Sequence, residues 1–481
     1  MTKERIKTAI LISLFMVSIF LANQIWIELP ESFFPSFADE LYYIDSKDIF
    51  SDIVSPERYL VNFGNKHTVL YNDNEHELWK EGRDLIINIF KNNNYISQII
   101  ESDELHKHRE SLSLDYFFSE KLHIYLISKT LDINIPSSVY NEIEQANNIH
   151  ISLGKEPFIV FSNGDIHLKI SDLENVNKLE SEISNIRKTI NAIRKESPTE
   201  FFAISYAFPE IDNHEFIPTK MKYSLPEIVV KSEIDIDNKY VDSIARNFFD
   251  NLEYARPFVE ANGSTIYVYN EEVLKIYQDG MLEYSNLNHE PVRNRELYKS
   301  LNTAINFITK HLGWPENSYL KSIEPIEFEN SKGYRFKFMY KISQAQIMLN
   351  EDHSMEAPIE IEVFNDYVKS YKRLVRLNLT PLNINQANDN MLSPTQIIVD
   401  NKTNYELIKS KYIQKNKLNE EDIAESQINI LSFIDNLYLA YYKTRTKKIS
   451  SNLGLTLIPV WVIEIDGITF IFDAYEGTKL D

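Results

Sequence analysis

An uninterrupted apolar segment opens the hydrophobic pattern of this chain, because no charged residue lies between Lys7 and Glu28. A helix of about 20 residues spans the roughly 30 Å hydrocarbon core of a bilayer, so the pattern predicts a transmembrane helix over Thr8–Ile27. Basic residues precede it, and such residues favour the cytoplasmic side. We therefore expect a cytoplasmic tail over residues 1–7, a linker over residues 28–37 and an extracytoplasmic remainder.

A cleaved signal peptide is the alternative interpretation of the apolar segment. Signal peptidase prefers small residues at positions −3 and −1 of its cleavage site, but Ala22 has Phe20 at that spacing. The sequence Ser36-Phe37-Ala38 fits the preference but lies about ten residues beyond the apolar run. We therefore expect the helix to be retained as an anchor, with Trp26 at its outer interface.

Beyond the linker, helical and strand periodicities alternate, which predicts an α+β fold. Apolar positions at helical spacing predict helices over His76–Asn92 and Tyr240–Leu252. A third amphipathic helix is expected to be capped by Asn294 and to end at Gly313. Leu173–Lys195 is charged and weakly periodic, so an exposed helix is expected there.

Turn signals between alternating segments predict antiparallel hairpins. Asn163-Gly164 separates two short apolar runs, and both turn residues tolerate positive φ. Three strands in quick succession are expected between Thr265 and Tyr284.

The C-terminal third repeats a strand-and-turn pattern at a constant separation of 101 residues. This repeat predicts two similar units, each a helix on an antiparallel sheet, although the helices align poorly at that separation. The corresponding features are Phe336-x-Phe338-x-Tyr340, Pro358 and Asn365-Asp366 in one unit, and Leu437-x-Leu439-x-Tyr441, Pro459 and Asp466-Gly467 in the other.

These patterns predict three extracytoplasmic α+β domains. The N-terminal domain is expected over residues 38–235, the middle domain over residues 236–380 and the C-terminal domain over residues 381–481. The length of the chain agrees with this number of domains.

Composition narrows the classes of function. A hydrophobic content of 43% with 12% aromatic residues excludes a disordered stalk. The formal net charge of −21 argues against binding to nucleic acid. The chain has no Cys, so disulfides and thiolate metal sites are excluded.

Candidate catalytic chemistry is sparse, and the 11 His residues are scattered along the sequence. His106-x-His108 lies among acidic residues and would suit a metal if it formed a strand, but a solvated polar segment is the preferred interpretation. Glu360 and Glu362 share one strand face, as paired glycosidase carboxylates would, yet any half-buried strand alternates in this way. Trp461 is interpreted as a buried sheet aromatic rather than a pocket wall. We expect no catalytic residue, cofactor or metal.

Several short motifs resemble the YycH family, to which YycI is a smaller relative. They occur in order along the chain, although residues 91–225 carry no match. The motifs are Glu4-Arg5-Ile6-Lys7-Thr8, Ser55-Pro56-Glu57-Arg58 with Trp79, Ile244-Ala245-Arg246-Asn247-Phe248-Phe249-Asp250 with the strands of 265–284, and Leu457-Ile458-Pro459-Val460-Trp461-Val462 with the Asp466-Gly467 turn.

The resemblance implies a non-enzymatic, single-pass regulator of WalK, the sensor histidine kinase that governs cell-wall metabolism in low-GC Gram-positive bacteria. It also implies three extracellular domains, of which the last two are alike. A WalK-like kinase and a YycI-like protein would then be the membrane partners. The alternatives are a membrane-anchored hydrolase of wall polymers and an adaptor for another envelope complex.

Small residues in the apolar segment suggest how such partners could bind. Ala9 and Ser13 form one small-xxx-small pair, and Ser18 and Ala22 form another. Small residues allow helices to approach closely inside a bilayer. At about 100° per residue, the two pairs point to roughly opposite sides of the helix, so two neighbours could be bound at once.

Overall fold

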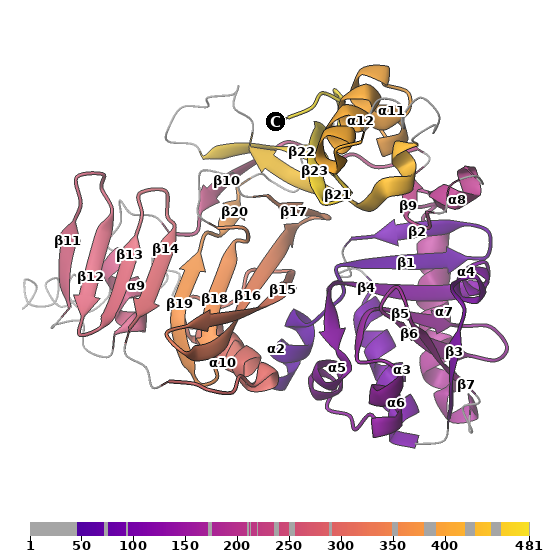
Figure 1. Ribbon diagram of the computed structural model, residues 1–481, viewed down its shortest axis with the longest axis horizontal. Coiled ribbons are helices and arrows are strands. Elements are labelled where there is room, and N and C mark those ends of the chain that lie inside the picture. The colour runs from indigo at the N-terminus through magenta and orange to yellow at the C-terminus, as the bar shows by residue number, and fades with distance from the viewer. Residues whose placement is uncertain are drawn as a thin grey trace, which may run out of the picture. The chain divides into compact units, whose positions relative to one another are not determined.

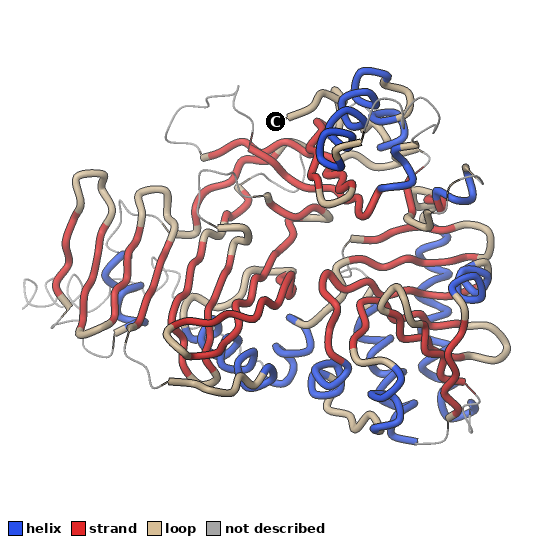
Figure 2. The backbone as a smooth tube through the Cα atoms, viewed as in Figure 1, coloured by secondary structure: helices blue, strands red, loops and turns tan. Residues whose placement is uncertain are grey.

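Helices and strands are mixed along the described chain, so the α+β prediction is confirmed (Figures 1 and 2). The chain divides after Ser46 into two units, and Lys47–Asp481 contains both sheets described below. The computed structural model describes residues 46–71, 76–92, 95–171, 176–208, 211, 213–218, 220–234, 240–249, 255–287, 291–348, 355–379, 391–418, 429–443 and 454–480.

The predicted membrane helix Thr8–Ile27 lies outside the described residues, as do its small residues Ala9, Ser13, Ser18 and Ala22. Within the described ranges, no helix is both long and apolar enough to cross a membrane. The predicted domain boundaries after residues 37, 235 and 380 also fall outside the described ranges, so the division into domains stays a prediction.

The first sheet contains nine antiparallel strands and includes most of the region that carries no family motif. Asn163-Gly164 connects two neighbouring strands, and Gly164 has a φ of +94°, so this predicted hairpin is confirmed. In spatial order the strands are β3 (Ile96–Ile100), β7 (His167–Ser171), β6 (Phe158–Ser162), β5 (Gln145–Ser152), β4 (Leu112–His123), β1 (Arg58–Phe63), β2 (His67–Leu70), β8 (Phe201–Ala203) and β9 (Phe216–Pro218).

Two helices, α3 (Leu78–Asn92) and α7 (Val176–Lys195), cover one face of this sheet (Figure 1). The expectation that α7 would be exposed is wrong. Its apolar residues recur every three or four positions and are buried against α3 and the sheet: Leu179, Ile183, Ile186, Ile190 and Ile193. The many charges of α7 hide this narrow stripe in the sequence, and only the packing reveals it.

Gly82 of α3 allows a close approach to the sheet, because a Cβ there would meet the hydroxyl of Tyr116.

The remaining helices of this region are short. The short helices are α2 (Ser46–Ile53), α4 (Ser102–Arg109), α5 (Ile124–Thr130), α6 (Ser137–Glu142) and α8 (Ile204–Ala207).

The second sheet contains fourteen strands among the described residues. Its neighbours are antiparallel except for the pair β17–β21, which is parallel. The main path runs β11 (Arg256–Val259), β12 (Thr265–Tyr269), β13 (Glu272–Ile276), β14 (Leu282–Asn286), β19 (Tyr367–Arg373), β18 (Ile359–Phe364), β16 (Ser331–Ile342), β17 (Ala345–Ile347), β21 (Ile434–Lys443), β22 (Leu455–Ile465), β10 (Ile228–Ser232) and β20 (Arg376–Asn378), while β15 (Ser318–Phe328) pairs with β16 and β23 (Ile468–Asp473) with β22.

Both hairpins of the predicted repeat are present. β18 and β19 meet at Asn365-Asp366, β22 and β23 meet at Asp466-Gly467, and the first residue of each turn has positive φ. β18 begins directly after Pro358, whereas β22 begins at Leu455 and carries Pro459 within the strand. The superposition of the two complete units stays a prediction.

Five helices among the described residues alternate along the chain with the strands of the second sheet. The expectation that Asn294 caps the third amphipathic helix is wrong, because α10 begins at Leu297 and the carbonyl of Asn294 accepts a hydrogen bond from Asn365 instead. The helices are α9 (Tyr240–Phe248), α10 (Leu297–Lys310), α11 (Pro394–Ile398), α12 (Lys402–Asn416) and the 3₁₀ helix η3 (Ile430–Phe433).

Glu57, from one of the family-like motifs, joins the two sheets. Its carboxylate accepts hydrogen bonds from Ser119 of β4 at 2.6 Å and from Tyr319 of β15 at 3.3 Å. Lys321 of β15 lies 3.4 Å away, and Lys341 of β16 donates to the backbone carbonyl of Glu57. A mostly buried carboxylate with two lysines therefore connects β15 and β16 to the first sheet.

Candidate functional site

A covered polar surface occupies the face of the first sheet opposite α3 and α7. On β4, Leu114 and Tyr116 point into the core, so the alternating positions Ser113 and Asp115 point to the other side. The strand register places Asp115 opposite His150 of β5. All of these polar side chains are buried, although an antiparallel sheet often leaves its second face in water.

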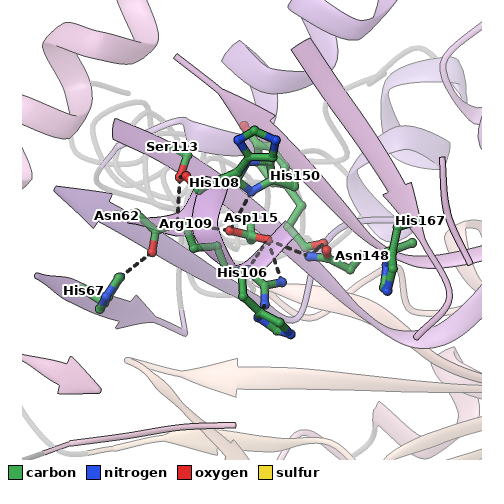
Figure 3. Close-up of polar contacts among 12 residues, drawn as sticks. Asn62, His67, His106, His108, Arg109, Ser113, Asp115, Asn148, His150 and His167 are labelled. Carbon is green, nitrogen blue, oxygen red and sulfur yellow. Dashed lines mark hydrogen bonds and ion pairs between the residues drawn. The ribbon is translucent and has the colours of Figure 1, made fainter. Parts of the chain in front are cut away.

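Asp115 is the centre of this polar surface and is fully buried (Figure 3). Arg109, from the end of α4, donates from Nε and Nη2 to Oδ1 at 3.0 and 2.9 Å. Asn62 donates to Oδ2 at 3.1 Å, and Asn148 donates to Oδ1 at 3.4 Å. His150 Nδ1 lies 3.1 Å from Oδ2 and carries its proton there, because a carboxylate only accepts.

These contacts keep Asp115 ionised. Burial alone would raise the pKa of its carboxyl, but the positive charge of Arg109 and the hydrogen bonds from Arg109 and His150 hold that pKa well below its usual range. The site therefore contains a permanent Arg109–Asp115 ion pair inside the protein.

Histidines that are scattered in the sequence surround this ion pair. His67 lies 2.7 Å from the side-chain oxygen of Asn62, and His167 lies 2.7 Å from the hydroxyl of Ser162. Six of the 11 histidines lie in this part of the first sheet: His67, His106, His108, His150, His167 and His214.

His106 and His108 lie in α4 and are both half-buried, so the segment is neither the strand of the metal-site alternative nor the fully solvated segment that we preferred. Positions i and i+2 of a helix point in different directions. The ring of His106 stacks on that of His214 with 3.5 Å between centroids, whereas the ring of His108 packs against Phe158 at 4.5 Å. Over the described ranges, no three His, Asp or Glu side chains converge as metal ligands.

The hydrogen bonds define His106 as a neutral ring. Arg109 donates from Nη1 to Nδ1 of His106 at 3.2 Å, so Nδ1 is an acceptor and Nε2 carries the proton toward Ser102. Burial and the nearby charge of Arg109 lower the pKa of His106 to about 3. The ring therefore adds no positive charge to the site near neutral pH.

A cavity of about 240 Å³ adjoins the Arg109–Asp115 pair. It lies between the first sheet and the segment that enters β9. A second ion pair borders it, because Arg58 donates from both terminal nitrogens to Glu215 at 3.0 and 3.1 Å. The lining residues are Arg58, Leu60, Val69, Arg109, Phe117, Asn213, His214, Glu215 and Phe216.

The other residues that the sequence analysis considered for catalysis or binding, Glu360, Glu362 and Trp461, are hydrogen-bonded within the second sheet and its neighbouring segments. Glu362 is held by Arg335 at 2.7 Å, and Glu360 accepts the backbone N–H groups of Glu356 and Ala357. The interpretation of Trp461 is confirmed, because its ring is fully buried in β22 and its indole N–H donates to the carbonyl of Leu392 at 2.9 Å.

The polar surface leaves a weak signal in the sequence. Asn148, His150 and Ser152 alternate with Ile149 and Ile151. The same alternation describes a strand with one face in water, which is the common case. Only the tertiary structure distinguishes a covered polar face from a solvated one.

We expect the protein to lose stability as the pH falls from 7 to 5. Burial is the main cause of lowered pKa values at His67, His106, His108 and His167. The unfolded chain takes up protons on these rings near pH 6.5, whereas folded His106 does so only near pH 3. Their contribution is therefore complete above pH 6.5 and is lost as the pH falls toward 3.

His106 alone should account for a loss of roughly 1 kcal/mol in the free energy of unfolding between pH 7 and pH 5, allowing for its partial exposure. Urea unfolding midpoints at pH 7 and pH 5 measure the effect. His106→Gln should reduce the difference between the two midpoints. If the unfolding midpoints of the wild type and the variant depend on pH in the same way, His106 is not a neutral ring with a lowered pKa.

The fold is similar to that of a solved structure, YycH from Bacillus subtilis. The TM-score is 0.52 at 13% sequence identity, and the similarity covers 88% of this chain and 96% of that chain. No protein-family model matches the sequence, and no curated protein sequence matches it. The comparisons therefore establish a YycH-like fold for this chain.

Proposed function

We propose that this protein is a non-enzymatic regulator of a WalK-like sensor histidine kinase that controls cell-wall metabolism. In this proposal Thr8–Ile27 anchors the chain in the cell membrane, residues 1–7 are cytoplasmic, and the remainder is extracytoplasmic. A WalK-like kinase and a YycI-like protein are its membrane partners.

The fold similarity to YycH is the observation that supports this proposal most strongly. It extends over nearly the whole of both chains rather than over one common domain. Fold alone does not define function, but the YycH-like motifs occur in order along the sequence. The Ser55–Arg58 motif, moreover, supplies two ion pairs of the structure: Glu57 with Lys321 and Arg58 with Glu215.

Co-purification and kinase output test the proposal. A tagged full-length protein should retain the WalK-like kinase of the same organism, and deletion of its gene should change the expression of genes that the kinase controls. The proposal is contradicted if the kinase does not co-purify with the tagged protein and deletion of the gene leaves the expression of the kinase-controlled genes unchanged. Release of soluble wall fragments by the purified full-length protein would instead support the hydrolase alternative.

Packing inside the bilayer is the expected route of coupling, because the predicted cytoplasmic tail is too short to bind much. Replacing Ala9 and Ser13 by Leu, or Ser18 and Ala22 by Leu, should reduce kinase co-purification by closing the approach of a neighbouring helix. Leu keeps the segment apolar, so insertion should be retained.

Each double variant also acts as a control for the other, since the two pairs are expected on different sides of the helix. If both variants retain wild-type co-purification and kinase output, control lies in the extracytoplasmic part. Membrane fractionation confirms that each variant is still inserted.

A further inference from the structure

The cavity beside the Asp115 network is lined by hydrogen-bond donors that have no acceptor among the described residues. Arg58 uses its two terminal nitrogens on Glu215, and Arg109 uses its nitrogens on Asp115 and His106. A guanidinium group has more N–H donors than these bonds consume. The remaining donors of both arginines have no acceptor among the described residues, and both side chains line the cavity.

The two arginines that line the cavity are balanced by carboxylates among the described residues. Each arginine is matched by one carboxylate: Arg58 by Glu215 at 3.0 Å and Arg109 by Asp115 at 2.9 Å. The adjacent ring of His106 stays neutral, because Arg109 donates to its Nδ1. A charged ligand would therefore enter a partly enclosed site in which the described residues offer no unpaired counter-charge, which is unfavourable.

The remaining walls are apolar and aromatic. Leu60 and Val69 are buried, and Phe117 lies beneath both guanidinium groups, with ring centroids 4.8 Å from Arg58 and 5.7 Å from Arg109. Phe216 closes another side. Such walls suit a ligand that has one apolar face and oxygen atoms along its edge.

The size of the cavity limits the ligand. At about 240 Å³ it is smaller than the common range for drug-sized ligands, about 300–1,000 Å³. One substituted six-membered ring therefore suits it better than an oligomer does. Arg58 and Glu215 retain side-chain exposures of 15% and 23%, which places the route to solvent beside this ion pair.

We infer that this cavity is a binding site for an uncharged monosaccharide, whose hydroxyl oxygens accept the remaining N–H groups of Arg58 and Arg109 while its C–H face packs on Phe216. The inference goes beyond the proposed regulatory function and does not depend on it. Sugar binding and kinase output can each succeed or fail alone.

Titration of the full-length protein with matched sugars tests this inference. Saturation-transfer NMR should show saturable binding of glucose or N-acetylglucosamine with a Kd on the order of 1 mM. Glucuronate has the ring of glucose with a carboxylate in place of the CH₂OH group. It should bind at least about tenfold more weakly, because both arginines of the wild-type site are already paired with carboxylates.

Two variants make the test specific. Glu215→Gln keeps the shape of the side chain but leaves Arg58 without its carboxylate, so it should reverse the preference in favour of glucuronate. Val69→Phe should fill the cavity and abolish binding of all three sugars. Thermal unfolding checks that each variant is folded. If Val69→Phe does not fold, the sugar preference of Glu215→Gln decides the outcome.

Three results would each overturn the inference. The first is the absence of saturable binding of both neutral sugars to the folded wild type. The second is glucuronate binding to the wild type as tightly as glucose. The third is an unchanged sugar preference in Glu215→Gln.

Discussion

Replacing Glu57 by Ala is expected to reduce the free energy of unfolding by about 3–5 kcal/mol, the cost of breaking a buried ion pair. The Glu57 side chain is only 13% exposed, and its carboxylate balances the charges of Lys321 and Lys341. Lys341 is itself buried, so it cannot simply turn into water. The ammonium group would remain in a low-dielectric junction without this carboxylate.

The effect should depend on pH in a defined direction. Burial opposes ionisation of Glu57, but Lys321 and Lys341, helped by the hydrogen bond from Ser119, lower its pKa to about 2. The unfolded carboxyl titrates near 4.5. The stabilisation is therefore complete above pH 4.5 and is lost as the pH falls toward 2.

Urea unfolding of the full-length protein at pH 7 and pH 3 measures both the size and the pH dependence. Glu57→Gln keeps the side-chain volume and should lose most of the same free energy. Glu327→Ala is the matched control on β15, because Glu327 forms only an exposed pair with Lys332 at 3.8 Å and should change stability by less than about 0.5 kcal/mol. Equal stability of Glu57→Ala and the control would show that the junction is not held electrostatically.

Replacing Asp115 by Ala is expected to cost about 3–5 kcal/mol as well. The side chain is fully buried, and removing it leaves the buried guanidinium of Arg109 without its carboxylate. Donors from Asn62, Asn148 and His150 would also lose their common acceptor. Because unsatisfied buried polar groups are costly, the loss should exceed that of a surface carboxylate severalfold.

Asp115→Asn distinguishes charge from shape at this position. The amide has the size of the carboxylate but only one acceptor oxygen, so it should recover part of the loss and not all of it. Asp165→Asn is the control, since Asp165 is 87% exposed and pairs with Lys121 at 3.8 Å. Unfolding of the full-length variants in urea, together with hydrogen exchange of β4 and β5, provides the measurement. A wild-type exchange pattern in Asp115→Ala would contradict the central role of this carboxylate.

Family resemblance and tertiary structure contribute different parts of the functional argument. The motif Ser55–Arg58 can be recognised in the sequence, but none of the partners of its charged residues can. Glu57 meets Lys321 and Lys341, and Arg58 meets Glu215, all more than 150 positions away. A motif gives residue identity, whereas the pairing follows from how the two sheets pack.

The sequence by itself determined the features that depend on neighbouring residues. The hairpins at Asn163-Gly164, Asn365-Asp366 and Asp466-Gly467 follow from residues that tolerate positive φ between alternating strands. The helix over 78–92 follows from apolar residues on one face. These signals depend only on neighbouring residues, so they can be recognised before any long-range contact is known.

Only the tertiary structure decided the candidate site. Asn62, Arg109, Asp115 and His150 come from three strands and a helix, and their contact depends on the order and register of those strands. Tertiary structure also decided the burial of α7, whose charged residues mask its apolar stripe. The alternation of polar and apolar residues along a strand indicates which side chains face away from the core. It does not indicate whether that face of the sheet is covered by other segments. Covering is a property of distant segments, and it turns a polar face into a buried ion-pair network beside a cavity.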